Sequence, residues 1–371
     1  MKNIAWYEIV DVENIDSPAL AVYPRRIESN IQKMIDIAGG TDHLRPHIKT
    51  HKIAEIIEMQ LKSGISKFKC ATISEAALLA SCGAKDVLLA MQPVGKNIAR
   101  FFELMADFPR TTFSTLVDCN EVIREIERSA IAQKTKVDLW LDINNGMNRT
   151  GVEPNEDAVK IYQILDQSLH VVARGLHVYD GHIHESDFEK RREICDNDYK
   201  AVLQLHSKLE ELGIEVGTIV AGGTPTFPIH SGRDHVEVSP GTTLLWDQGY
   251  ADSYRDLDFL PAAVLIGNVV SKPKTGLMCL NLGHKSIAAE MPFPRAKILT
   301  ISDCEQISHS EEHLVVECPN SNLYPVGSIV YAIPTHICPT VIKYQEVLTI
   351  EDHSVTGTWK IAARDHKIST P

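Results

Sequence analysis

The sequence lacks the features that mark several large classes of protein. Its longest apolar runs, such as residues 262–267, have the length of a strand and not of a transmembrane helix. Its eight cysteines form no CxxC pair, and no basic stretch offsets the formal net charge of −12. These absences argue against a membrane protein, against a disulfide scaffold and against binding to nucleic acid or to an anionic membrane. Because acidic residues stand where a signal peptide needs an apolar stretch, we expect a cytoplasmic protein with reduced cysteines.

The first two-thirds of the chain alternates short apolar runs with segments of helical spacing. Residues 19–23 precede the helical 25–38, for example, and residues 137–143 precede the helical 156–167. About eight such pairs predict a parallel sheet of the α/β class, closed into a (β/α)8 TIM-type barrel. An open doubly wound sheet is the alternative, but the GxGxxG turn expected after its first strand is absent.

The pattern changes after residue 257, where short strand-like runs are separated by Gly, Pro and Asn. Helical periodicity nearly disappears, which indicates an antiparallel β domain. We therefore expect a barrel over residues 16–256 and a C-terminal β domain over residues 257–371, joined by residues 1–15.

The densest polar cluster is LRPHIKTHK at residues 44–52, at the end of an expected strand. Strand alternation would put Arg45, His47 and Lys49 on one face. On the barrel interior, burial and neighbouring cations would lower the pKa of Lys49 and leave the neutral amine that Schiff-base chemistry needs. A solvated basic turn is at least as good an explanation of the spacing alone.

Two glycine–threonine turns follow late strands of the expected barrel. Gly222-Gly223-Thr224 and Gly241-Thr242 could present backbone N–H groups to one phosphate. Ordinary tight turns are the alternative, and a lone Gly-Gly favours it.

The segment IPTHICPT at residues 333–340 places His336 and Cys338 two residues apart, on one face if the run is a strand. Imidazole and thiolate suit zinc or a similar metal. A buried cysteine beside an ordinary histidine is the alternative, which a single HxC favours. Glu290, Glu312 and His313 are further polar residues of the β domain that could reach a site, although an ordinary surface role explains them better.

Two more polar clusters follow expected strands. A loop presents Arg149 after NNGMN, and residues 175–184 bring together His177, Tyr179 and His182. Since the carboxyl ends of parallel barrel strands form one mouth, we expect these clusters to meet there.

Taken in order, the motifs RPHIKTHK, NGMNRTG, GLHVYDGH, AGGTPTFP, SPGTTLLWD and PTHICPT resemble those of the D-threonine aldolase and D-serine dehydratase family. These are fold-type III pyridoxal-phosphate (PLP) enzymes related to alanine racemase. The resemblance covers nearly the whole chain, and the combination of RPHxKTHK with a late HxC is specific.

The resemblance implies a role for each of these residues. Lys49 would form the Schiff base with PLP, and a divalent metal (Zn, Mn or Mg) would lie beside the cofactor on His336 and Cys338. His177 and His182 are the candidates for a second acid or base. Ser239 stands where racemases place an Arg facing the pyridine nitrogen, which suits a lyase better than a racemase. The other implied cofactor contacts are Arg149 near the phenolic oxygen, Tyr179 beside the ring, and Gly223, Thr224, Gly241 and Thr242 at the phosphate.

The implied activity is a PLP- and metal-dependent lyase acting on D-3-hydroxy amino acids, of the D-threonine aldolase type. D-Serine dehydratase would use the same residues and is the main alternative. An amino-acid racemase fits Ser239 less well, and a PLP-homeostasis protein is less consistent with the β domain and its HxC. A non-PLP barrel with a structural HxC is the remaining alternative. The partners implied are a small D-amino acid and a second copy of the chain, with no nucleic acid and no membrane.

Overall fold

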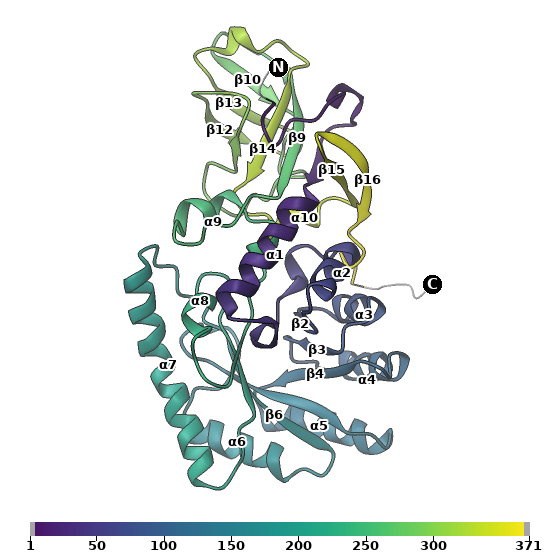
Figure 1. Cartoon of the computed structure of the whole chain (residues 1–371), viewed down its shortest axis with the longest axis vertical. Helices are drawn as coiled ribbons and strands as arrows, with labels where there is room; N and C mark the ends of the chain where they lie inside the picture. The colour runs from purple at the N-terminus through teal and green to yellow at the C-terminus, as the bar shows by residue number, and fades with distance from the viewer. Residues whose placement is uncertain (1–3, 367–371) are drawn as a thin grey trace. The chain divides into compact units, whose positions relative to one another are not determined.

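The computed structural model describes residues 4–366 and divides them into two compact units. One unit, the barrel unit, contains Lys33–Lys52 and Ile57–Gly241 together with residues 365–366. The other, the β unit, contains residues 4–32, Ile53–Ile56 and Thr242–Arg364. Figure 1 labels the elements of both, and each unit is described by itself.

The barrel unit is built on a seven-stranded sheet in which every pairing is parallel. Its strands are nearly continuously buried, as expected for strands covered by helices on one side and filled by side chains on the other. In sheet order they are β2 (Lys67–Cys70), β3 (Asp86–Leu89), β4 (Thr112–Val117), β5 (Val137–Ile143), β6 (Val171–Val178), β7 (Thr218–Ala221) and β8 (Val236–Val238).

A short segment at residues 44–47 joins the two ends of this sheet. Leu44 makes a parallel bridge to Val238 of β8, and His47 makes one to Lys69 of β2. The amide of Arg45 donates to the carbonyl of Val238 at 2.9 Å, and the amide of Lys69 donates to the carbonyl of Pro46 at 2.9 Å. The segment therefore takes the eighth strand position, and the predicted barrel is confirmed.

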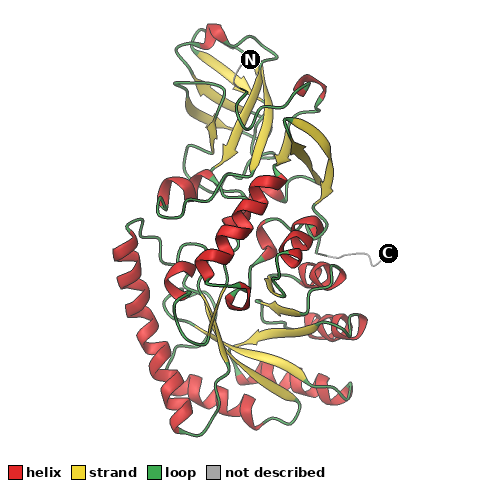
Figure 2. Cartoon of the chain, viewed as in Figure 1, coloured by secondary structure: helices red, strands yellow, loops and turns green. Residues whose placement is uncertain are grey.

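Helices follow the strands and lie outside them within this unit (Figure 2). Several begin at side-chain caps: Thr72 accepts from the amide of Glu75, and Asp187 accepts from the amide of Lys190. Inside the barrel, Leu88, Leu116, Trp140 and Val220 form a buried cluster. The helices of this unit are α3 (Ile73–Ser81), α4 (Lys96–Asp107), α5 (Asn120–Ala132), α6 (Glu156–Gln167), α7 (Phe188–Glu211) and α8 (Phe227–His230), with 3-10 turns η2 (Thr41–His43) and η3 (Ile48–Thr50). The helices α1 (Pro24–Ala38) and α2 (Ala54–Lys62) each begin among residues of the β unit and end among residues of the barrel unit.

The β unit contains a nine-stranded, largely antiparallel sheet, as predicted for the C-terminal part. Its core includes Ala21, Val264, Ile266 and Tyr331. Its strands are β1 (Ala19–Val22), β9 (Ala263–Ser271), β10 (Leu277–Leu280), β11 (Ala296–Ile298), β12 (Glu305–His309), β13 (Leu314–Glu317), β14 (Ile329–Pro334), β15 (Glu346–Glu351) and β16 (Ser354–Lys360). Its helical segments are η1 (Val12–Asn14), η4 (Thr242–Leu244), α9 (Gln248–Ser253), η5 (Ser321–Leu323) and α10 (Cys338–Val341).

The strand at the start of the chain belongs to the β unit and not to the barrel. β1 pairs antiparallel with β9 and parallel with β15, so the prediction that this run is the first barrel strand is wrong. The run is apolar enough to be buried in either sheet, and periodicity cannot tell which partner strand it will meet.

Within residues 4–366, no helix combines the length and the apolar character needed to cross a membrane. All eight cysteines are free thiols, and none of them is fully exposed.

Candidate active site

Lys49 lies in the turn η3, just after the segment that closes the barrel. The amide of Lys49 donates to Nδ1 of His47 at 3.2 Å, which fixes the turn, and the Lys49 side chain is exposed. The prediction that Lys49 is buried on a strand face with Arg45 is therefore wrong. Arg45 is fully buried and instead bonds Glu237 at 2.7 Å and Asp86 at 2.6 Å.

The buried amine at this place is Lys69, which the sequence analysis missed. Lys69 stands on β2 opposite His47, and it is 3% exposed. Burial and the neighbouring charge of Lys49 lower the pKa of Lys69 to about 7. A lysine within the apolar run FKCAT was the available signal, because a charged residue inside a buried strand requires an explanation.

Lys69 belongs to a buried chain of three polar side chains. Its Nζ lies 3.5 Å from Nε2 of His177, and Nδ1 of His177 lies 2.7 Å from Oδ1 of Asp142. Burial lowers the pKa of His177, which favours the neutral ring. With the ring proton on Nδ1 facing the carboxylate, Nε2 can accept a hydrogen bond from Lys69. Asp142 thus orients His177, and His177 orients the amine.

Lys52, the other lysine of the basic motif, is held in an ion pair. Its Nζ forms an ion pair with Oε1 of Glu75, whose second oxygen accepts from the amide of Ala71 at 2.7 Å. This pairing leaves Lys49 as the lysine of the motif that is better placed to react.

The Tyr179 ring follows β6 and lies over two glycines. A Cβ on Gly181 would come within 2.3 Å of the ring, and a Cβ on Gly223 would come within 3.0 Å. The guanidinium carbon of Arg149 is 4.9 Å from the ring centroid, and Nζ of Lys69 is 5.7 Å from it. The structure therefore brings the predicted Tyr179, Arg149 and Gly223 together with Lys69.

The two predicted phosphate turns lie side by side. Gly222 adopts the left-handed conformation with φ 76°, and the amide of Gly223 donates to Oγ1 of Thr226 at 3.1 Å. The amide of Gly241 donates to Oγ1 of Thr224 at 3.1 Å, which links the turn after β8 to the turn after β7. A Cβ on Gly241 would lie 3.1 Å from the carbonyl oxygen of His47, so the basic motif borders the same turns.

The other predicted site residues of the barrel, Ser239 and His182, bond to protein groups outside the buried chain that contains Lys69. The Ser239 hydroxyl is buried and donates to the carbonyl of Arg45 at 2.8 Å. Nε2 of His182 lies 2.9 Å from Oδ2 of Asp198, and a Cβ on Gly146 would lie 2.7 Å from that same Nε2. His182 therefore packs under the loop that carries Arg149, which is a supporting position.

The predicted metal ligands lie in the β unit. β14 ends at Pro334 and α10 begins at Cys338, so the predicted strand does not extend through this pair. Nδ1 of His336 is 2.5 Å from Oε1 of Glu290, and Sγ of Cys338 is 3.5 Å from Oγ1 of Thr242. Burial opposes protonation of His336, but contacts with Cys338 and Glu290 and the charge of Asp247 raise its pKa to about 9.

Asp247 is a residue of this region that the sequence analysis missed. It is buried and accepts from the amides of Ile337 at 3.0 Å and Tyr250 at 2.9 Å, so it fixes the turn between His336 and Cys338. Burial raises its pKa to about 6. An aspartate directly before α9 was visible as a helix cap, but its second contact spans 90 residues.

Comparisons with known proteins agree with the predicted resemblance. The chain is 27% identical to a D-threonine aldolase of Arthrobacter sp, with 94% of this chain and 93% of the relative covered. It is 27% identical to a 3-hydroxy-D-aspartate aldolase of Paracoccus denitrificans, with 96% and 94% covered. It is 21% identical to a D-serine dehydratase of Dictyostelium discoideum, with 94% and 97% covered.

The fold agrees as well. The crystal structure of a D-threonine aldolase from Filomicrobium marinum matches with a TM-score of 0.87 at 26% identity, covering 95% of this chain and 96% of that one. Residues 262–350 match the family described as "Putative serine dehydratase domain", and residues 22–248 match "Alanine racemase, N-terminal domain". The second match spans more than half of the sequence, and so the chain belongs to the alanine racemase N-terminal domain family, in agreement with the predicted relationship to alanine racemase.

Proposed function

We propose that the chain is a PLP- and divalent-metal-dependent lyase that cleaves D-3-hydroxy amino acids, of the D-threonine aldolase type. The observation that carries the proposal is the meeting of Lys69, Tyr179, Arg149 and the two glycine turns beside the lysine motif. Relatives named as D-threonine and 3-hydroxy-D-aspartate aldolases support the same reaction class.

The residues fit PLP. A Cβ on Gly223 would crowd the Tyr179 ring, and a Cβ on Gly241 would crowd the carbonyl of His47, so only glycine lets the backbone of these two linked turns come this close to the ring and to the lysine motif. Exposed backbone N–H groups at such turns are what a phosphate binds. Lys49 would hold the aldehyde carbon of PLP, and Tyr179 would lie beside the PLP ring. When bound, PLP accepts the electron pair released from the substrate Cα.

The proton acceptor in this proposal is Lys69. An aldol cleavage removes the proton of the β-hydroxyl, breaks the Cα–Cβ bond and releases an aldehyde. The oxygen's proton would pass to Nζ of Lys69, whose pKa of about 7 suits this task near neutral pH. A proton returned to Cα then completes glycine. His177 and Asp142 hold the amine in place, so His177 positions the base.

His336 and Cys338 would hold the divalent metal, with Glu290 beside His336. Their nitrogen and sulfur donors suit a borderline metal such as zinc. When bound, the metal lowers the pKa of the substrate hydroxyl. Metal identity, a homodimer and a cytoplasmic location are part of this proposal by family resemblance.

D-Serine dehydratase activity is the second candidate. Residues 262–350 match the family described as "Putative serine dehydratase domain", and the similarity to a D-serine dehydratase extends over 94% of this chain. The purified holoenzyme should be given D-threonine, L-threonine and D-serine separately. We expect glycine and acetaldehyde from D-threonine alone. Pyruvate and ammonia from D-serine, with no cleavage of D-threonine, would replace the aldolase by the dehydratase.

A further inference from the structure

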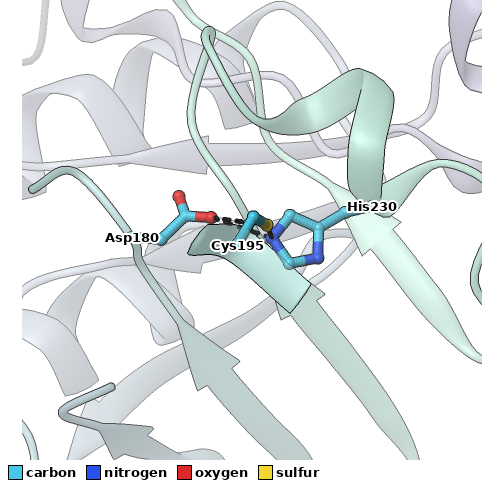
Figure 3. Close-up of side chains that lie close together, drawn as sticks. All are labelled: Asp180, Cys195 and His230. Carbon is cyan, nitrogen blue, oxygen red and sulfur yellow. Dashed lines mark hydrogen bonds and ion pairs between the residues drawn. The ribbon is translucent and has the colours of Figure 1, made fainter. Parts of the chain in front are cut away.

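A buried group of three side chains in the barrel unit, different from the predicted ligands of the β unit, has the composition of a metal site. Asp180 follows β6, Cys195 lies on α7 and His230 ends α8, and their side chains converge (Figure 3). Each residue is at most 2% exposed. The loop after β6, the helix α7 and the helix α8 each contribute one residue, so the convergence depends on how these elements pack.

The distances between the three donor atoms are short. Nε2 of His230 lies 2.8 Å from Oδ2 of Asp180 and 3.2 Å from Sγ of Cys195, and that Sγ lies 3.7 Å from Oδ2. Tetrahedral zinc, with bonds of about 2.0–2.3 Å, would separate such ligand atoms by roughly 3.3–3.6 Å. Shifts of about half an ångström would therefore bring all three into contact with one ion.

The charges of the group also suit a divalent cation, because a carboxylate and a thiolate together balance its two positive charges. Without a metal, the three contacts between the side chains share only two protons, one on Nε2 of His230 and one on Sγ of Cys195. Nη2 of Arg233 lies 4.0 Å from Sγ of Cys195, which favours the thiolate once a metal displaces its proton. In the metal-free group, burial raises the pKa of the Cys195 thiol and keeps it protonated.

We propose that Asp180, Cys195 and His230 bind Zn2+, with a fourth position for a small ligand such as water. Imidazole, thiolate and carboxylate are zinc ligands, while magnesium prefers oxygen alone. The proposal does not depend on the function proposed above.

The position of the site indicates what the metal would do. The other carboxylate oxygen of Asp180 accepts from Oγ1 of Thr226 at 2.7 Å, and Oγ1 of Thr226 accepts from the amide of Gly223 at 3.1 Å. The ion would therefore fix the loop after Tyr179 and the Gly222–Thr226 turn to α7. Because it binds the folded chain, it would also stabilise that chain.

Cobalt substitution tests the site without any measurement of activity. Both proteins should carry Cys338→Ala, so that the cysteine of the other predicted metal pair cannot contribute. The second protein should also carry Cys195→Ser. Circular dichroism should confirm that both proteins fold. Loaded with Co2+, the first protein should show a thiolate-to-cobalt absorption band. The second should lose this band. A band that survives Cys195→Ser, or no band in the first protein, would overturn the proposal and leave a hydrogen-bonded cluster.

A second measurement covers the case in which Cys195→Ser does not fold. Zinc-edge X-ray absorption on the Cys338→Ala protein, after gel filtration, should show one sulfur at about 2.3 Å from zinc. Zinc with nitrogen and oxygen neighbours only, or no retained zinc, contradicts the assignment.

Discussion

Nζ of Lys69 lies 3.5 Å from Nε2 of His177, deep in the barrel and 3% exposed to solvent. Asp142 holds the far side of the same imidazole at 2.7 Å. A buried amine with one weak neutral acceptor and a second lysine nearby is poorly stabilised as an ammonium, and this relationship underlies the proposed acid–base chemistry.

Lys69→Met should stabilise the protein, and the gain should depend on pH. The pKa of Lys69 is about 7 in the folded protein, against 10.5 ordinarily, so the unfolded chain binds this proton more tightly. The resulting cost to wild type is complete below pH 7 and disappears as pH rises through 10.5. At about 1.4 kcal/mol per pKa unit, the variant should gain a few kcal/mol at pH 6.

Urea unfolding of the cofactor-free proteins at pH 6, 8 and 10 measures this gain. The free energy of unfolding of Lys69→Met should exceed that of wild type most at pH 6. A difference that is constant across the three pH values would show that Lys69 is charged throughout.

Gly181→Ala should displace the Tyr179 ring. The new Cβ would meet the ring at 2.3 Å, and the ring must move from its place beside Arg149. We expect the dissociation constant for PLP, measured by absorbance titration, to rise about tenfold or more, which is about 1.4 kcal/mol. Gly232→Ala is the matched control because nothing lies within 4 Å of its Cβ. Equal affinities in the two variants would mean that Tyr179 does not contact the cofactor.

Lys52→Met should destabilise the fold, because it leaves the fully buried Glu75 without its ion-pair partner. Breaking a buried pair costs about 3–5 kcal/mol, and adding Glu75→Gln should recover much of that loss. Lys160→Met, which removes an exposed pair with Asp157, should change the free energy of unfolding by less than about 1 kcal/mol. Comparable losses in the two single variants would refute the structural role assigned to Lys52.

If the proposed metal assists the reaction, its removal should strongly slow aldol cleavage while PLP stays bound. Lewis-acid assistance contributes several kcal/mol, so dialysis against a chelator should lower turnover by about 100-fold or more. His336→Gln should raise the metal concentration needed for recovery, and Cys304→Ser, in the same unit, should not. Full turnover in the chelated protein, with metal content verified, would exclude the metal from the reaction.

The barrel and the β domain could be predicted from the sequence because periodicity and apolar runs determine them locally. The strand at Ala19–Val22 could not be assigned, because its hydrophobicity suits both sheets and only pairing with β9 and β15 decides between them. The predicted position of Lys49 failed for a related reason: the strand at 44–47 is only long enough to bridge its neighbours before the chain turns.

Strand order predicted that the polar clusters would meet at one mouth, and the closeness of Tyr179 to Arg149 and to Gly223 agrees with it. Lys69 and Asp247 were not found. Each acts through partners far away in the sequence, His177 for Lys69 and Ile337 for Asp247, which spacing alone does not reveal.

In the proposed function, Lys49 holds PLP while Lys69 remains a free amine beside it. Borohydride reduction of the holoenzyme, followed by proteolysis and peptide mass mapping, fixes the cofactor to the lysine that holds it. We predict one phosphopyridoxyl group on the peptide containing Lys49, in wild type and in Lys69→Met alike. Label on Lys69, or no label on either lysine, would contradict the proposed role of Lys49.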